Sequence, residues 1–231
     1  MTPELFAPGL VSTGLAERDV AISPDGREIY FAVTFRTTTT IMTAQFKQGR
    51  WTPPAVASFA ADLTYYNMEP CMSGDGRQVF FLTNRPRAGG AYGEPERLPD
   101  VINGTGATFN ACVAPDEQYL IAGVEGRDDS TPPKKANYYV FFRSADGTWA
   151  PGVNPGPVVN DPANTVHSPY ISPDGKYLFF ASNASRDRSP TPPGPLTLPQ
   201  LVDLSRSPQN GNSDIYWVRA EVIEQLRRAH E

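Results

Sequence analysis

A short motif, Ser-Pro-Asp-Gly followed by a run of apolar residues, occurs near the end of this chain and in altered form at three earlier places. The four copies are residues 23–32, 73–82, 114–123 and 172–181. Pro at the second position presets φ to about −65°, and Gly at the fourth accepts a positive φ, so the motif predicts a tight turn. The Ile, Val, Leu, Tyr and Phe residues after it suit a pleated, buried strand, and another short apolar stretch precedes it. Each copy therefore predicts a strand, a turn and a second strand.

The third copy departs from the pattern, because Glu117 stands where the other three copies have Gly26, Gly76 and Gly175. A residue other than glycine costs about 1 kcal/mol at positive φ. We therefore expect this turn to be looser than the others or of another type.

The turn aspartates set the period of the repeat. Asp25, Asp75, Asp116 and Asp174 are separated by 50, 41 and 58 residues. A period of about 40–50 residues with four strands in each unit is typical of a propeller blade. The predicted fold class is all-β: a small β-propeller of four recognisable blades, or a shortened form of a five- or six-bladed ancestor. The aspartates themselves are explained as turn residues.

The repeats cover almost the whole chain, so we expect a single domain over residues 1–231. The predicted blades are about 17–57, 66–101, 107–158 and 164–218, and outer strands are expected at 51–57 and 149–151. The second blade is short, because no third strand fits before an outer-strand motif at 92–98. Either this blade has three strands or a stretch has been lost there, so the blade count around residues 85–95 stays open.

The fourth blade carries a long insertion and has no outer-strand motif of its own. The insertion, residues 185–213, is rich in proline; loops of that length are usually functional or disordered, and residues 196–204 are able to form a short helix. Residues 5–12 form a short apolar stretch and are the expected donor of the missing strand. Val222, Ile223, Leu226 and Ala229 have the spacing of one helical face, which predicts a C-terminal helix over 219–230.

Composition excludes several classes of protein. The net charge is −5, and Lys and Arg cluster only as two adjacent pairs, so nucleic acid is not an expected partner. The chain has no apolar run of the roughly 18–20 residues that span a bilayer, so a membrane is not expected either. The N-terminus lacks a basic region followed by an apolar one. We expect a cytoplasmic protein, with a periplasmic or secreted one as the alternative if the chain has been trimmed, and a monomer.

Cys71 and Cys112 occupy the same position of two repeats. We expect both to be small buried hydrophobic residues that do not point at each other. A disulfide between them is the alternative.

The repeats resemble the WD40-like propeller repeats of the TolB type, which occur in bacterial proteins. The resemblance rests on Ser-Pro-Asp-Gly-Lys-x-Leu-Phe-Phe-x-Ser-Asn at 172–183, Asp-Ile-Tyr-Trp-Val at 214–218, and the outer-strand motifs that begin at Trp51 and Trp149. It covers nearly the whole chain. It implies the propeller fold and is weak for function, because such propellers serve as binding platforms, as accessory domains of peptidases and occasionally as enzymes.

A polar residue stands four positions before the first turn residue in every repeat: Asp19, Glu69, Asn110 and Ser168. Arg18 and His167 each precede one of them. The innermost strand of a blade lines the propeller axis, so these six residues predict a polar, partly acidic ring that binds a cation or a polyhydroxylated ligand. The alternative interpretation is that they are solvated strand ends, with Arg18 paired to a neighbouring carboxylate.

The sequence predicts no catalytic residue, metal ligand or cofactor, because no nucleophile elbow, zinc motif or Cys-x-x-Cys is present. A lone histidine such as His167 is more often structural than catalytic. The predicted function is a non-enzymatic β-propeller that binds a protein partner or a small polar ligand at its axial face. The alternative is a carbohydrate-active hydrolase or lyase in which Asp19 and Glu69 form an acid pair with His167 beside them.

Overall fold

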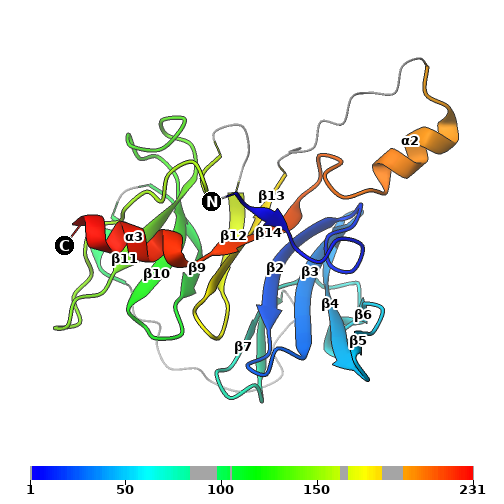
Figure 1. The fold of residues 1–231 in the computed structure, drawn as a ribbon, viewed down its shortest axis with the longest axis horizontal. Coiled ribbons are helices and arrows are strands. Elements are labelled where there is room, and N and C mark those ends of the chain that lie inside the picture. The colour runs from blue at the N-terminus through cyan, green and yellow to red at the C-terminus, as the bar shows by residue number, and fades with distance from the viewer. Residues whose placement is uncertain (1, 84–97, 105, 162–165, 184–194, 231) are drawn as a thin grey trace.

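The computed structural model describes residues 2–83, 98–104, 106–161, 166–183 and 195–230 (Figure 1). The described residues are mainly β, and all pairings between the strands are antiparallel, which confirms the all-β class. The strands are β1 (Glu4–Leu5), β2 (Ala16–Ile22), β3 (Glu28–Phe35), β4 (Thr38–Lys47), β5 (Arg50–Trp51), β6 (Ala55–Val56), β7 (Asn67–Met72), β8 (Val79–Thr83), β9 (Thr108–Val113), β10 (Tyr119–Val124), β11 (Asn137–Phe142), β12 (Val166–Ile171), β13 (Tyr177–Ser182) and β14 (Asp214–Arg219). The helices are η1 (Ser58–Ala60), α1 (Asp100–Asn103), α2 (Leu198–Ser205) and α3 (Glu221–His230).

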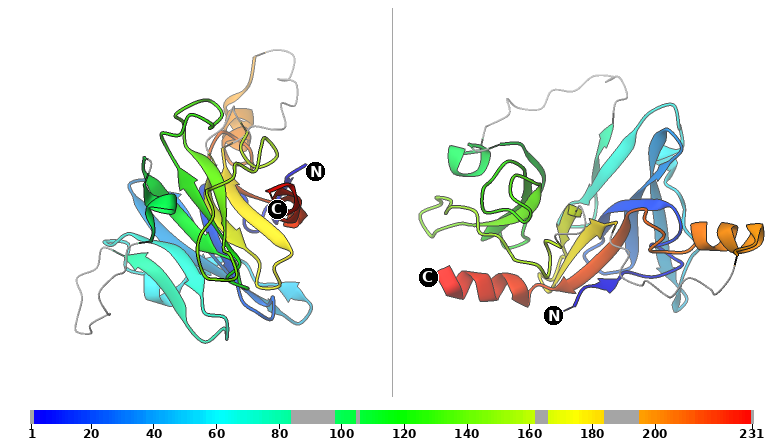
Figure 2. Two further views of the ribbon diagram at one scale, coloured as in Figure 1. Left: turned by 90° about the vertical axis from the view of Figure 1, so that its left-hand side faces the viewer. Right: turned by 90° about the horizontal axis from the view of Figure 1, so that it is seen from above.

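Each sequence repeat supplies the first two strands of its own sheet. The sheets run β2-β3-β4-β5 with β6 on β4, then β7-β8, then β9-β10-β11, and last β12-β13-β14-β1. The first strands of different sheets lie side by side, because β2 contacts both β7 and β12, and β12 also contacts β9. The sheets fan outward from these first strands in the two views of Figure 2.

The repeated turns have one hydrogen-bond pattern. In the first copy the amide of Gly26 donates to the carbonyl of Ser23 at 2.8 Å, and the Ser23 hydroxyl donates to the carboxylate of Asp25 at 2.6 Å. The same serine–aspartate bond, also 2.6 Å long, recurs in the copies at 73 and 172. The hydroxyl of Ser23 and then the amide of Arg27 lower the pKa of Asp25. The repeated Ser-Pro-Asp-Gly motif therefore stabilises a turn.

The turn at Glu117 is closed in the same way as the others, so the expectation of a looser turn is wrong. The Glu117 amide donates to the carbonyl of Ala114 at 2.9 Å, and Glu117 accepts a φ of 58°, compared with 67° at Gly26. The Ala114 amide also bonds to the carbonyl of Tyr119, at 2.9 Å, as Ser23 does to Glu28. The hairpin pairing of β9 with the buried β10 fixes the turn, and Glu117 tolerates the left-handed conformation.

Replacing Glu117 with glycine is expected to raise the free energy of unfolding by about 1 kcal/mol, because it removes the cost of a side chain at positive φ. The lost ion pair with Arg143 is 3.5 Å long and exposed, so its contribution is small. The matched control is Gly175→Ala, where φ is 70° and an added Cβ would meet nothing within 4 Å. This control should lower stability by a similar amount in urea unfolding. A neutral Glu117→Gly beside a costly Gly175→Ala would contradict the shared turn geometry.

The outer strands are shorter than the sequence predicts. In the first repeat the expected strand at 51–57 is broken into β5 and β6, and in the third repeat only isolated bridges, Arg143–Trp149 and Val140–Val153, occur. Prolines 53, 54 and 151 interrupt these segments and have no amide hydrogen to donate to a ladder. In the second repeat, residues 84–97 lie outside the described part. The predicted absence of a third strand and most of the predicted outer-strand motif at 92–98 fall in this range.

The N-terminal strand pairs with β14 in the sheet of the fourth repeat. Glu4 lies opposite Trp217 and Leu5 opposite Tyr216, and the Phe6 amide donates to the carbonyl of Ile215 at 2.7 Å. The pairing covers residues 4–6, so the expected strand over 5–12 is wrong in its extent. Residues 7–12 turn back on themselves instead, with the amides at 10 and 11 both donating to the carbonyl of Ala7.

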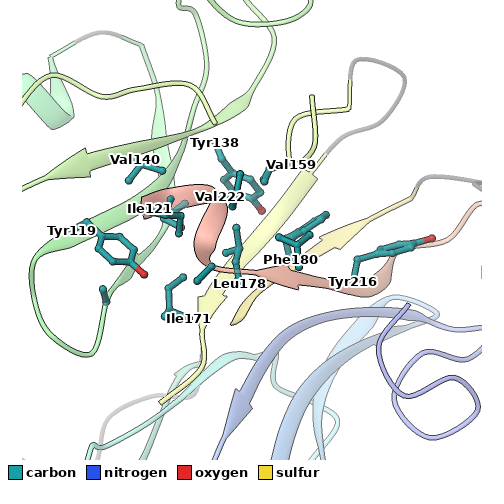
Figure 3. Packing of buried hydrophobic residues seen from close by; sticks show 14 residues of the cluster. Tyr119, Ile121, Tyr138, Val140, Val159, Ile171, Leu178, Phe180, Tyr216 and Val222 are labelled. Atoms are coloured by element: carbon teal, nitrogen blue, oxygen red, sulfur yellow. The ribbon is translucent and has the colours of Figure 1, made fainter. Parts of the chain in front are cut away.

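The largest core cluster joins the third and fourth sheets to α3. Tyr138 from β11, Phe180 from β13, and Val222 and Ile223 from α3 are all buried in it (Figure 3). A second cluster joins the first and fourth sheets and includes Val11. Helix α3 begins two residues after the start of the helix that the sequence predicted over 219–230.

Helix α2 lies at the opposite end of the molecule from α3 and projects from the sheets (Figures 1 and 2). Its N-terminus has a capping box formed by Thr197 and Gln200. None of its residues is buried, and Leu198 is 73% exposed. This helix overlaps the stretch 196–204, where the sequence analysis allowed a short helix. Residues 184–194, which include most of the first part of the same insertion, lie outside the described part.

Candidate functional site

The four ring positions share an unusual backbone conformation. Asp19, Glu69, Asn110 and Ser168 have positive φ values of 56°, 55°, 48° and 59°. The pairing register shifts beside each of them, so every first strand has a bulge at the same point. Positive φ is uncommon for residues other than glycine, and only Asn and Asp among these four residues are enriched there. Strain that recurs in every repeat supports the hypothesis that these bulges serve a function.

Side chains at the bulges connect the first three repeats. The Arg18 guanidinium donates to Asp19 through Nε at 2.7 Å, and the Glu69 amide donates to the same Asp19 oxygen at 3.3 Å. The Asn110 side-chain amide donates to Glu69 Oε1 at 2.8 Å. Arg18 also lies 3.6 Å from that oxygen. These contacts bring four of the six predicted site residues together: Arg18, Asp19, Glu69 and Asn110. They include the pairing of Arg18 with a neighbouring carboxylate, which the alternative interpretation of these residues as strand ends also predicts.

The fourth repeat comes near the same group at His167. Burial lowers the pKa of His167, the positive charge of Arg18 lowers it further, and Asp19 opposes both. His167 is therefore near both residues. Ser168 is buried, and its hydroxyl has no hydrogen-bond partner among the described residues. We call Arg18, Asp19, Glu69, Asn110, His167 and Ser168 the polar ring.

Two residues after each bulge lies a second set of equivalent positions: Ala21, Cys71, Cys112 and Tyr170. Burial raises the pKa of Cys112 to about 11, and Cys71 contributes to this shift. Both cysteines also contribute to the raised pKa of Tyr170, so the two cysteines and Tyr170 lie near one another. Both cysteines are free. Cys71 is exposed, so the expectation that it is buried is wrong: it pairs with Phe80, which also faces solvent. The expectation that equivalent positions keep the two cysteines apart is not supported.

Two surface clefts lie at the turns, away from the polar ring. One, of about 500 Å³, lies between the turns of the third and fourth repeats and the start of α3, and is lined by Tyr119, Tyr177, Lys176 and Glu224 among others. The other, of about 480 Å³, lies between the turns of the first two repeats. Neither includes a residue of the polar ring. The ring is therefore not part of either cleft.

The sequence identified the ring residues by their types and spacing, but it contained no sign of the backbone bulges, because Asp, Glu, Asn and Ser rarely adopt a positive φ. Among the residues that the structure describes, no group of three or more His, Cys, Asp or Glu side chains is placed to hold a metal ion. Within the same ranges, no helix is long and apolar enough to cross a membrane.

Comparisons with known proteins gave only distant similarities. No family model matches the chain, and no curated protein matches it. Among solved structures, TolB from Acinetobacter baumannii is similar at 12% identity and a TM-score of 0.34, over 88% of this chain and 43% of that one. Hydrazine synthase from Kuenenia stuttgartiensis is similar at 14% identity and a TM-score of 0.24, over 71% of this chain and 38% of that one. The chain thus spans about two fifths of the length of each of these chains.

Proposed function

We propose that this chain is a non-enzymatic protein of the β-propeller type, which binds a small polar ligand or a polar group of a protein partner at the polar ring. The observation that carries the proposal is the repeated bulge, which presents a polar side chain at the same point of all four first strands. Packing alone would not select a polar residue in a strained conformation four times.

The chemistry of the ring suits a ligand with both donors and acceptors. Arg18 offers a planar guanidinium with donors in a fixed geometry, while Glu69 and Asp19 offer carboxylate oxygens. Arg18 and Glu69 are partly exposed, whereas Asp19 is buried and acts through them. A hydroxyl-rich molecule or a charged peptide group would exchange these internal bonds for charge-assisted bonds of its own.

The test uses two glutamates that each accept one side-chain amide at the same distance. Glu69 Oε1 accepts a side-chain amide of Asn110 at 2.8 Å in the ring, and Glu28 Oε1 accepts the side-chain amide of Gln45 at 2.8 Å outside it. Glu69→Gln and Glu28→Gln remove one charge each and keep the acceptor oxygen. The wild type is titrated calorimetrically with a panel of monosaccharides, amino acids and short peptides of both charges, and each ligand that binds is then titrated against the variants.

We expect Glu69→Gln to weaken binding of such a ligand by about ten-fold or more, because a hydrogen bond to a charged group contributes about 1.5–3 kcal/mol. Glu28→Gln should leave the affinity unchanged. A ligand that binds both variants equally well, and also binds Arg18→Gln equally well, would show that the ring is not the site. Turnover of a glycan that Glu69→Gln abolishes would favour the hydrolase or lyase alternative instead.

A further inference from the structure

A buried pair of carboxyl groups lies outside the bonded network of the polar ring, where the chain enters the first repeat. Glu17 on β2 is fully buried at 0% exposure, and Asp214 at the start of β14 is 1% exposed. The two segments are joined directly, because the Glu17 amide donates to the carbonyl of Ser213 at 2.7 Å. The pair thus stands where the segment before the first repeat meets the end of the insertion in the fourth.

In each of these carboxyl groups, one oxygen accepts a hydrogen bond and the other has no hydrogen-bond partner among the described residues. Glu17 Oε1 accepts the hydroxyl of Thr13, and Asp214 Oδ2 accepts the amide of Gln209 at 2.7 Å. Glu17 Oε2, Asp214 Oδ1 and the hydroxyl of Ser213 are buried and have no hydrogen-bond partner among the described residues. A buried acceptor without a partner costs free energy, and a buried charge without one costs more. These three oxygens lie on two segments that a backbone hydrogen bond joins, and the described residues leave their hydrogen-bonding capacity unused.

The electrostatics of the pair indicate what kind of ligand would fit. Among the described residues, no hydrogen bond or ion pair joins a lysine, arginine or histidine side chain to either carboxyl group, and their partners are Thr13 and Gln209. A divalent cation would supply the positive charge that the two carboxylates lack.

We propose that Glu17 Oε2, Asp214 Oδ1 and the Ser213 hydroxyl bind a hard divalent cation, of which Ca²⁺ is the best match. The potential ligands are all oxygens, which Ca²⁺ takes in sets of six to eight at about 2.3–2.6 Å with water completing the set. The absence of nitrogen and sulfur from this set disfavours Zn²⁺. The bound ion would link the start of β2 to the start of β14, and so would stabilise the contact between the first and last repeats.

The experiment measures cation binding by the full chain after treatment with a chelator, at pH 8, well above the ordinary pKa of a carboxyl group. Calorimetry with CaCl₂ should show one site per chain. At about 100 times the dissociation constant, Ca²⁺ should raise the melting temperature by roughly 5–10 °C. Terbium emission sensitised by the protein's aromatic residues should appear on Tb³⁺ addition and disappear when Ca²⁺ displaces the Tb³⁺. Zn²⁺ should not displace it at the same concentration.

Glu17→Gln and Asp214→Asn keep the acceptors for Thr13 and Gln209 and remove only the charge, so both should abolish the Ca²⁺ response. Asp203→Asn removes an exposed carboxylate of α2 and should retain the full response. Ser213→Ala keeps both carboxylates, so it should fold even if the other variants do not, and it should weaken binding by roughly ten-fold. Absence of saturable Ca²⁺ and Tb³⁺ binding to the wild type would overturn the proposal. An unchanged affinity in Ser213→Ala together with either charge variant would overturn it as well.

Discussion

Phe180→Ala is expected to lower the free energy of unfolding by about 3–5 kcal/mol, which is the usual cost of removing a buried phenylalanine ring. Phe180 is 1% exposed and belongs to the core that joins the third and fourth sheets to α3. Its ring is stacked on that of Tyr216, with centroids 6.3 Å apart. Removal of the ring leaves a cavity that side chains on fixed strands cannot close. Urea unfolding followed by circular dichroism measures the loss.

The matched control for this prediction is Phe35→Ala. Phe35 is 41% exposed at the end of β3, so the same change there should cost less than about 1 kcal/mol. Similar losses for the two variants would contradict the position of the core between the third and fourth sheets.

Removal of residues 1–6 is expected to have the other large effect, a loss of about 3 kcal/mol, from the apolar area of Leu5 and Phe6 that is withdrawn from water. Phe6 contacts Phe179 edge to face, with ring centroids 4.9 Å apart. The truncation also leaves β14 as an unpaired edge, and exposed edges promote association between chains. We expect a lower melting temperature together with dimers or larger species in light scattering.

Removal of only residues 1 and 2 is the control, because it leaves β1 in place and should change neither property. If the longer truncation gave a monomer with the wild-type melting temperature, the pairing of Glu4 and Leu5 with β14 would contribute nothing to stability.

The parts of the fold that the sequence predicted well are those whose cause is local. A turn is decided by the residues in it, so the hairpins at Asp25, Asp75 and Asp174 follow from the motif, and the apolar spacing around Ile223 is enough to indicate a helix. The prediction at Glu117 was wrong because a hairpin with buried strands outweighs a local cost of about 1 kcal/mol. The outer strands were predicted too long because the tryptophans at 51 and 149 marked their start, but the prolines beside them decide how far they run.

The candidate site was predictable in its residues and not in its geometry. Equivalent positions 19, 69, 110 and 168 are visible in the aligned repeats, whereas the contact between Asn110 and Glu69 depends on two neighbouring sheets that are far apart in the chain. The carboxyl pair was missed altogether. Glu17 and Asp214 are separated by 197 positions in the sequence, and the motif that begins at Asp214 predicted a strand and not a carboxyl pair.

The pairing of Glu4 with Trp217 has a consequence for the time at which this protein completes its fold. A ribosome makes Trp217 213 residues after it makes Glu4. At about 5–20 residues per second the interval is roughly 10–40 s. During that time the N-terminal segment has no partner, while the first three hairpins are free to fold as each one emerges. The pairing of β1 with β14 therefore forms only after translation has passed residue 217.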